Sequence, residues 1–135
     1  MNTRSEKFKK SERLCSKKII ASLINEGDVY FTPLFKVVWM KYPVPLPSPA
    51  QVVFSVPKKG FRSAVTRNLL KRRMREAYRK NKYLLYDQLQ HAGIFIASII
   101  SFRNNSIATY AEIEKAMIET IERLASVASK SNKQC

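Results

Sequence analysis

Basic side chains form the pattern in this sequence that is best suited to chemistry, and that chemistry is the binding of phosphate. Residues 62–82 are predicted to form a helix, in which successive side chains are about 100° apart. Five polar groups then fall within an arc of about 100° on one side: Asn68, Lys71, Arg72, Arg75 and Arg79. Leu70, Met74 and Ala77 lie on the opposite side, where they would face a core. One helix can therefore bury an apolar stripe and present a row of phosphate-binding groups.

Like charges at three- and four-residue spacing distinguish this row from an ordinary solvated helix face. Solvated faces usually mix signs, because Glu–Lys pairs at those spacings stabilise a helix. Repulsion along this row disfavours the isolated helix and is relieved by an anionic partner. Arginine also holds phosphate through two parallel N–H groups. The row therefore indicates nucleic acid. Asn68 is its only amide, which is a poor inventory for reading base edges and argues against sequence-specific DNA recognition.

The net charge of the chain is concentrated in two segments. The 135 residues include 25 Lys and Arg against 10 Asp and Glu, a formal charge of +15. Residues 1–18 carry +5 and residues 58–82 carry +10, so the remainder is neutral. A generally solubilising surface would spread its charge. Two basic patches on a neutral domain instead indicate a binding surface for a polyanion.

The same composition excludes several classes of protein. The longest apolar stretch, residues 94–100, is far too short to span a bilayer, and residues 1–10 lack a signal-peptide pattern. Cys15 and Cys135 do not make a disulfide framework. We therefore expect a cytoplasmic protein with no membrane partner.

No combination of residues predicts catalysis by the protein itself. A metal-dependent nuclease needs clustered carboxylates, whereas Asp28 and Asp87 are isolated and the glutamates of the last helix share a solvated face. Ser55 has no base near it in the sequence, and His91 is the sole histidine. We expect no catalytic residue, no metal site and no small-molecule substrate.

Hydrophobic periodicity predicts the order αβββαβα in one α+β domain over residues 1–128. The expected helices cover residues 11–26, 62–82 and 109–128, with a short helical turn near 83–90. The expected strands cover residues 29–31, 34–42, 51–56 and 94–102. Residues 1–8 are expected to be poorly ordered, and residues 129–135 to form a flexible tail.

The sequence around the basic helix resembles the signature of the bacterial ribonuclease P protein subunit. Lys58-Lys59 follows a predicted strand, and residues 64–77 read AVTRNLLKRRMREA. The opening FKKSERL at residues 8–14 and Gly27 after the first helix are similar to the same family. The resemblance covers residues 8–127. It implies an α/β sandwich of two layers with one mixed sheet and a left-handed βαβ crossover, like a domain of a ribosomal protein.

The resemblance also implies a function. The enzyme would be a ribonucleoprotein that endonucleolytically removes the 5′ leader from precursor tRNA, with Mg²⁺ held by the RNA subunit and substrate. The expected partners are ribonuclease P RNA and precursor tRNA. The expected RNA-binding residues are Lys58, Lys59, Arg62, Arg67, Asn68, Lys71, Arg72, Arg75 and Arg79. A cleft between the first helix and the sheet would hold the leader, lined by Ile20, Ile24, Trp39, Ser55 and Lys59.

Several positions depart from the family pattern. Leu69 stands where the family usually has Arg, which removes one phosphate contact. Ile20 and Ile24 occupy cleft positions that are often aromatic, so base stacking from the first helix is weakened. One residue is inserted within residues 60–63, which changes the loop before the basic helix.

Trp39 has two interpretations. It alternates with Phe35 and Val37 on one strand face, which favours the core, whereas the family pattern favours a stacking platform for an unpaired nucleotide. The function also leaves alternatives open, because the same basic helix would serve a ribosomal-type structural RNA-binding protein or a sequence-tolerant DNA-binding protein.

Overall fold

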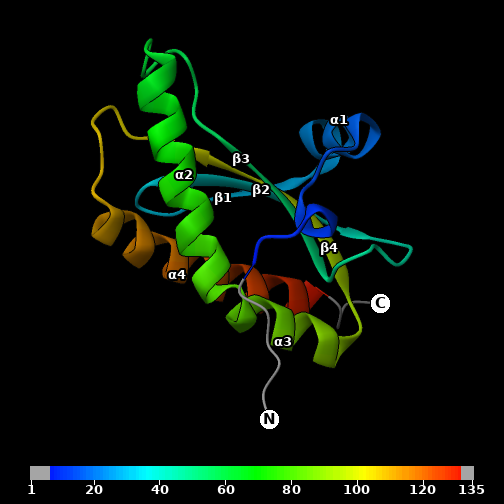
Figure 1. Cartoon of the computed structure of the whole chain (residues 1–135). Helices are drawn as coiled ribbons and strands as arrows, with labels where there is room; N and C mark the ends of the chain where they lie inside the picture. The colour runs from blue at the N-terminus through cyan, green and yellow to red at the C-terminus, as the bar shows by residue number, and fades with distance from the viewer. Residues whose placement is uncertain (1–6, 132–135) are drawn as a thin grey trace.

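Four strands form one mixed sheet in the spatial order β1-β2-β4-β3. A computed structural model describes residues 7–131. The strands are β1 (Asp28–Phe31), β2 (Phe35–Tyr42), β3 (Ala50–Ser55) and β4 (Phe95–Phe102). The central strand β4 pairs antiparallel with β2 and parallel with β3. The connection from β3 to β4 therefore has to cross over, and it contains two helices (Figure 1).

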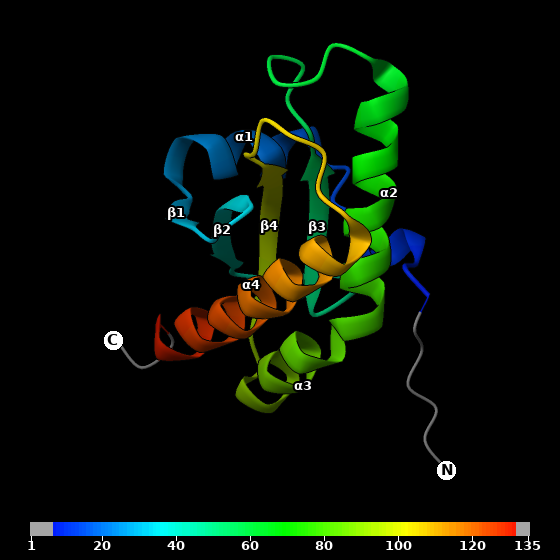
Figure 2. The same cartoon turned by 90° about the vertical axis from the view of Figure 1, so that its left-hand side faces the viewer.

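Three helices cover one face of the sheet. They are α2 (Ala64–Asn81), α3 (Tyr83–Ala92) and α4 (Tyr110–Ser131), and they lie together on that side (Figure 2). Alternate strand residues point into this main core, including Phe35 and Val37 of β2 and Ile96 of β4, all fully buried. We call this side the closed face. The mixed α+β fold is the one that the sequence predicts.

The opposite face of the sheet is only partly covered, and we call it the open face. Helix α1 (Lys17–Glu26) packs Ile19 and Leu23 against it, in a second cluster with Ala97 and Val38 that we call the α1 cluster. Its end approaches β2 closely, since a Cβ on Gly27 would lie 2.6 Å from Val38 Cγ1. Glycine at this position therefore sets how near α1 comes to the sheet.

The first predicted helix is wrong over residues 11–16. A short 3₁₀ turn, η1 (Lys10–Glu12), is followed by extended chain, because the Leu14 N–H donates to the Val52 carbonyl at 3.1 Å and Arg13 bridges to β3. Ser16 then caps α1, accepting from the Ile19 N–H. Hydrogen bonds to a strand about 40 residues away in the chain, which periodicity does not reveal, replace the first helical turn.

The other predicted boundaries hold to within a few residues, with exceptions at the ends and at α3. The expected short turn near 83–90 is a ten-residue helix that ends at Gly93, whose φ of 70° suits glycine. The expected tail begins too early, because α4 runs through Ser131. Phe8 falls in the segment expected to be poorly ordered, yet its ring packs 5.8 Å from both Phe54 and Tyr78. The rest of the predicted ends, residues 1–6 and 132–135, lies outside the described residues.

Lys82 joins α2 to α3 and is buried. Its Nζ donates to both carboxylate oxygens of Glu12 at 2.6 Å, and also to the Lys7 carbonyl. Both side chains of the pair are 6% exposed. This ion pair fixes the N-terminal segment, residues 7–13, against the end of α2.

Candidate nucleic-acid interface

Helix α2 presents the predicted row of polar groups outward. Leu70, Met74 and Ala77 are fully buried in the main core, so the helix has the predicted orientation. Asn68, Arg72 and Arg75 are exposed on the opposite side; Lys71 and Arg79 are half-buried. We call these five residues the outer arc. Helical periodicity alone was enough to place them.

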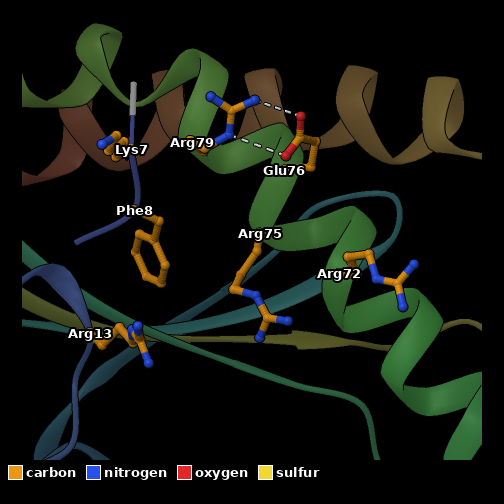
Figure 3. Close-up of a pocket in the computed structure, with 7 residues that line it drawn as sticks. All are labelled: Lys7, Phe8, Arg13, Arg72, Arg75, Glu76 and Arg79. Carbon is orange, nitrogen blue, oxygen red and sulfur yellow. Dashed lines mark hydrogen bonds and ion pairs between the residues drawn. The ribbon is translucent and has the colours of Figure 1, made fainter. Parts of the chain in front are cut away.

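A hollow of about 650 Å³ lies between the outer arc and the N-terminal segment (Figure 3). Arg72, Arg75, Glu76 and Arg79 line it from α2, and Lys7, Phe8 and Arg13 line it from the other side. The N-terminal segment holds its place because Phe8 packs on Phe54 and Tyr78 and because Glu12 pairs with Lys82. The buried ion pair therefore helps to bring Arg13 toward the arginines of the helix.

The hollow has an excess of positive charge. Its one lining carboxylate, Glu76, accepts from Arg79 at 2.6 Å and 3.1 Å, and this hydrogen bond lowers the pKa of Glu76. Within residues 7–131, the side chains of Arg13, Arg72 and Arg75 make no hydrogen bond or ion pair. Three arginines with no carboxylate partner around one hollow make a site for a polyanion.

Two other arginines of α2 bind to the chain itself. Arg73 lies off the outer arc, and its Nη1 donates to the Ala108 carbonyl at 2.6 Å. Arg67 Nη1 donates to the carbonyls of Phe61 and Arg62, both at 2.8 Å. Arg67 thereby fixes the loop that carries the inserted residue. Its predicted phosphate contact must use its remaining N–H groups.

The other predicted RNA-binding residues lie before the helix. Lys58, Lys59 and Arg62 are exposed in the loop from β3 to α2, beyond the end of the outer arc. The structure therefore brings the predicted set together as two neighbouring groups.

The predicted leader cleft is wrong at Trp39. This side chain is 4% exposed and lies in the main core, on the closed face. Strand residues alternate between faces, so Trp39 cannot share a surface with α1, which packs on the open face. Val38, the preceding residue, contacts the α1 cluster instead. Of the two interpretations of Trp39, the structure supports the core.

The remaining cleft residues lie on the side of α1. Ile20 packs partly into the α1 cluster, whereas Ile24 is 71% exposed. Ser55 is half-buried on the open face and Lys59 is exposed just beyond β3. These four, unlike Trp39, are compatible with one surface.

Sequence reasoning missed Phe8 and Arg13 as part of the site. Phe8 is an aromatic residue within a polar, basic segment, and such an isolated apolar residue is a signal for an anchor. The position of Arg13 had no signal of its own, because it depends on the β-bridge to Val52.

Among residues 7–131, no group of three or more His, Cys, Asp or Glu side chains could hold a metal ion. Burial raises the pKa of Tyr86 to about 12 and that of Tyr78 well above its usual value, so both tyrosines stay neutral. No helix in the described range is long and apolar enough to cross a membrane.

Comparison with known protein families finds relatives over most of the chain. Residues 8–125 match the family described as Ribonuclease P. A relative from Porphyromonas gingivalis, named ribonuclease P protein component, is 34% identical over 116 residues, which span 86% of this chain and 85% of the relative. A protein of the same name from Chlorobium phaeobacteroides is 42% identical over 82 residues, spanning 58% of this chain and 56% of that protein.

Solved structures show the same fold. The RNase P protein of Staphylococcus aureus aligns with a TM-score of 0.67 at 21% identity, covering 87% of this chain and 98% of the other. The RNase P protein from Thermotoga maritima aligns with a TM-score of 0.66 at 20% identity, covering 83% of this chain and 96% of the other.

Proposed function

The chain belongs to the ribonuclease P protein family, and on that premise we propose that the outer arc of α2 is the surface that binds the RNA subunit of the enzyme. Its role is that of the protein subunit in 5′ processing of tRNA. One observation supports the assignment of the surface above all others. Arg72, Arg75 and Arg13 converge on one hollow with no carboxylate partner in the described chain, and RNA supplies the missing negative charge.

The chemistry of cleavage is assigned to the RNA subunit. The described part of the chain offers no cluster of carboxylates or histidines that could activate water or bind two cations. Mg²⁺ would then be held by RNA and substrate, while this chain neutralises and orients phosphates. Acting in the cytoplasm would keep Cys15, an exposed free thiol, reduced.

The leader of precursor tRNA is assigned to the open face beside α1. Ile24 offers exposed apolar surface. On β2 the residue that faces α1 is Val38, because Trp39 points into the main core. Ser55 and Lys59 continue the surface toward the α2 loop and supply a hydroxyl group and a positive charge. Aliphatic contacts of this kind tolerate any base, which suits leaders of varied sequence.

Reconstitution tests the assignment to ribonuclease P. The purified protein is mixed with precursor tRNA, Mg²⁺ and its cognate ribonuclease P RNA, and 5′ cleavage is followed. We expect no cleavage by the protein alone, and cleavage with the RNA at a lower salt concentration than the RNA needs unaided. Metal-dependent cleavage by rigorously RNA-free protein would overturn the assignment. Binding without any stimulation would indicate a structural RNA-binding protein instead.

A paired substitution tests the leader surface. Ile24→Ser removes exposed apolar surface beside the open face, and Val44→Ser makes a similar change in the exposed β2–β3 loop. We expect Ile24→Ser to lower the affinity of the reconstituted enzyme for precursor tRNA several-fold, with mature tRNA unaffected. Equal behaviour of the two variants would contradict this part of the proposal.

A further inference from the structure

Two loops at one end of the sheet border a second hollow. The β3–α2 loop, residues 56–63, and the β4–α4 loop, residues 103–109, run close together (Figure 2). Between them lies a cavity of about 460 Å³, lined on one side by Lys59, Gly60 and Phe61 and on the other by Arg103, Asn104 and Asn105. A cavity of this size suits a small organic ligand. Lys59 is its only residue among the predicted RNA-binding groups.

Arg103 supplies a positive charge in a fixed position. Its Nε donates to the carbonyls of Thr32 and Phe35 at 3.2 Å, and its Nη2 donates to Thr32 at 2.9 Å. The guanidinium also lies over the ring of Phe31, 5.0 Å from its centroid. Within residues 7–131, Arg103 has no carboxylate partner. The loop geometry is thus already set for an anion, so little ordering entropy is lost on binding.

Phe61 supplies an aromatic wall. Its ring packs against Phe102 with centroids 5.9 Å apart, and Arg67 holds its backbone carbonyl. Phe61 also lines an adjoining hollow of about 440 Å³, together with Gly60 and Asn105. A half-buried ring that borders two hollows has surface available for stacking a base.

Asn104 and Asn105 complete the pocket with amide groups. Both side chains are exposed, and Asn104 Nδ2 donates to Ser106 Oγ at 3.3 Å. A side-chain amide both donates and accepts hydrogen bonds, as the edge of a nucleobase does. The pocket therefore combines an anion site, an aromatic wall and base-edge partners.

We propose that this pocket, between Lys59 and Arg103, binds one unpaired nucleotide of RNA. The phosphate would lie at Lys59 and Arg103, the base against Phe61, and the base edge near the two amides. A free phosphate would use only the two positive charges, whereas a nucleotide would also use the aromatic wall and the amides. The proposal rests on the proposed function, since it names a second point of RNA contact. The nucleotide could come from the leader or from the RNA subunit.

Gly60 provides a variant that blocks the pocket. A Cβ at this position would lie 3.8 Å from the Asn104 carbonyl oxygen and the Asn105 Oδ1, which is ordinary contact distance. Gly60→Leu therefore places a side chain at the mouth without a backbone clash. Asn105→Ala is a second, smaller change at an exposed position. Ala111→Leu, at an exposed position in the first turn of α4, is a matched control for added bulk.

The first experiment measures binding of a short labelled oligouridylate to the full-length protein. The same variants are then tested in the reconstituted enzyme. We expect Gly60→Leu to weaken oligonucleotide binding about tenfold, within the range for one stacked base, and Asn105→Ala to weaken it less. Ala111→Leu should bind like wild type. Unchanged binding by both pocket variants, each with an unchanged melting temperature, would overturn the proposal.

Two further measurements, made with the RNA subunit, identify the source of the nucleotide. A loss of preference for precursor over mature tRNA in Gly60→Leu assigns the pocket to the leader. A loss of affinity for the RNA subunit, measured without substrate, assigns it to that RNA. If the wild-type protein fails to stimulate its RNA, the proposed function fails, whereas normal stimulation with unaffected pocket variants overturns the pocket alone.

Discussion

Lys82 and Arg75 lie near each other in the sequence and carry the same charge, yet their roles differ. Lys82 is buried at the junction of α2 and α3, where Glu12 neutralises it. Arg75 is exposed on the outer arc and has no partner within residues 7–131. One charge stabilises the fold, and the other is available to RNA. The comparison shows that the net charge of residues 58–82 is larger than the charge that this segment presents to RNA, because Lys82 is buried and neutralised.

Breaking the buried pair gives the largest expected effect. Lys82→Met leaves the Glu12 carboxylate buried without a partner, which costs about 3–5 kcal/mol. Urea denaturation should show this loss of unfolding free energy. Glu12→Leu combined with Lys82→Met should recover most of it. A Lys82→Met protein as stable as wild type would show that the pair does not hold the N-terminal segment.

Trp39 tests the same distinction between fold and RNA surface at an aromatic residue. Trp39→Ala opens a cavity in the main core and should lower the unfolding free energy by about 3–5 kcal/mol. The preference of the enzyme for precursor over mature tRNA should not change, because Trp39 faces the closed side. A stable variant without this preference would restore the stacking role.

Arg73 and Arg72 allow the same contrast between a structural charge and an RNA-binding charge at adjacent positions. Arg73→Ala removes a charged hydrogen bond to the Ala108 carbonyl, a loss of about 1.5–3 kcal/mol in stability. The salt dependence of RNA binding should stay as in wild type. If Arg73→Ala lowers that dependence as much as Arg72→Ala does, the assignment of the helix faces is wrong.

The smallest expected effect is a gain. Glu76→Gln removes the one carboxylate that lines the hollow, and with it a negative charge that would repel phosphate. RNA binding should tighten by about threefold, because the hollow gains one net positive charge. Weaker binding by this variant would mean that Glu76 positions Arg79 for RNA and does not compete with it.

The sequence predicted the parts of this molecule that depend on local spacing. The outer arc and the buried stripe of α2 follow from helical periodicity. The reciprocal hydrogen bonds of Thr109 and Glu112 at the start of α4 likewise join residues three positions apart. These features involve residues within four positions of each other, so local pattern is enough.

The parts that the sequence did not predict depend on distant contacts. The partner of Lys82 is 70 residues away, and that of Arg73 is 35 residues away. Alternation along β2 places Trp39 and Val38 on different faces, but it does not say which face α1 covers. The face that α1 covers depends on how the whole chain packs. This packing determines that Val38, and not Trp39, lies at the proposed leader surface.

The salt dependence of binding is the most direct test of whether the outer arc of α2 binds ribonuclease P RNA. Affinity for the RNA subunit is measured over a series of salt concentrations for wild type and for Arg72→Ala with Arg75→Ala. We predict that the log–log slope falls by about two, because each substitution removes one cation from the phosphate backbone. We also predict an unchanged melting temperature, because neither side chain has a partner among the described residues. An unchanged slope in a normally folded double variant would show that the outer arc does not bind this RNA.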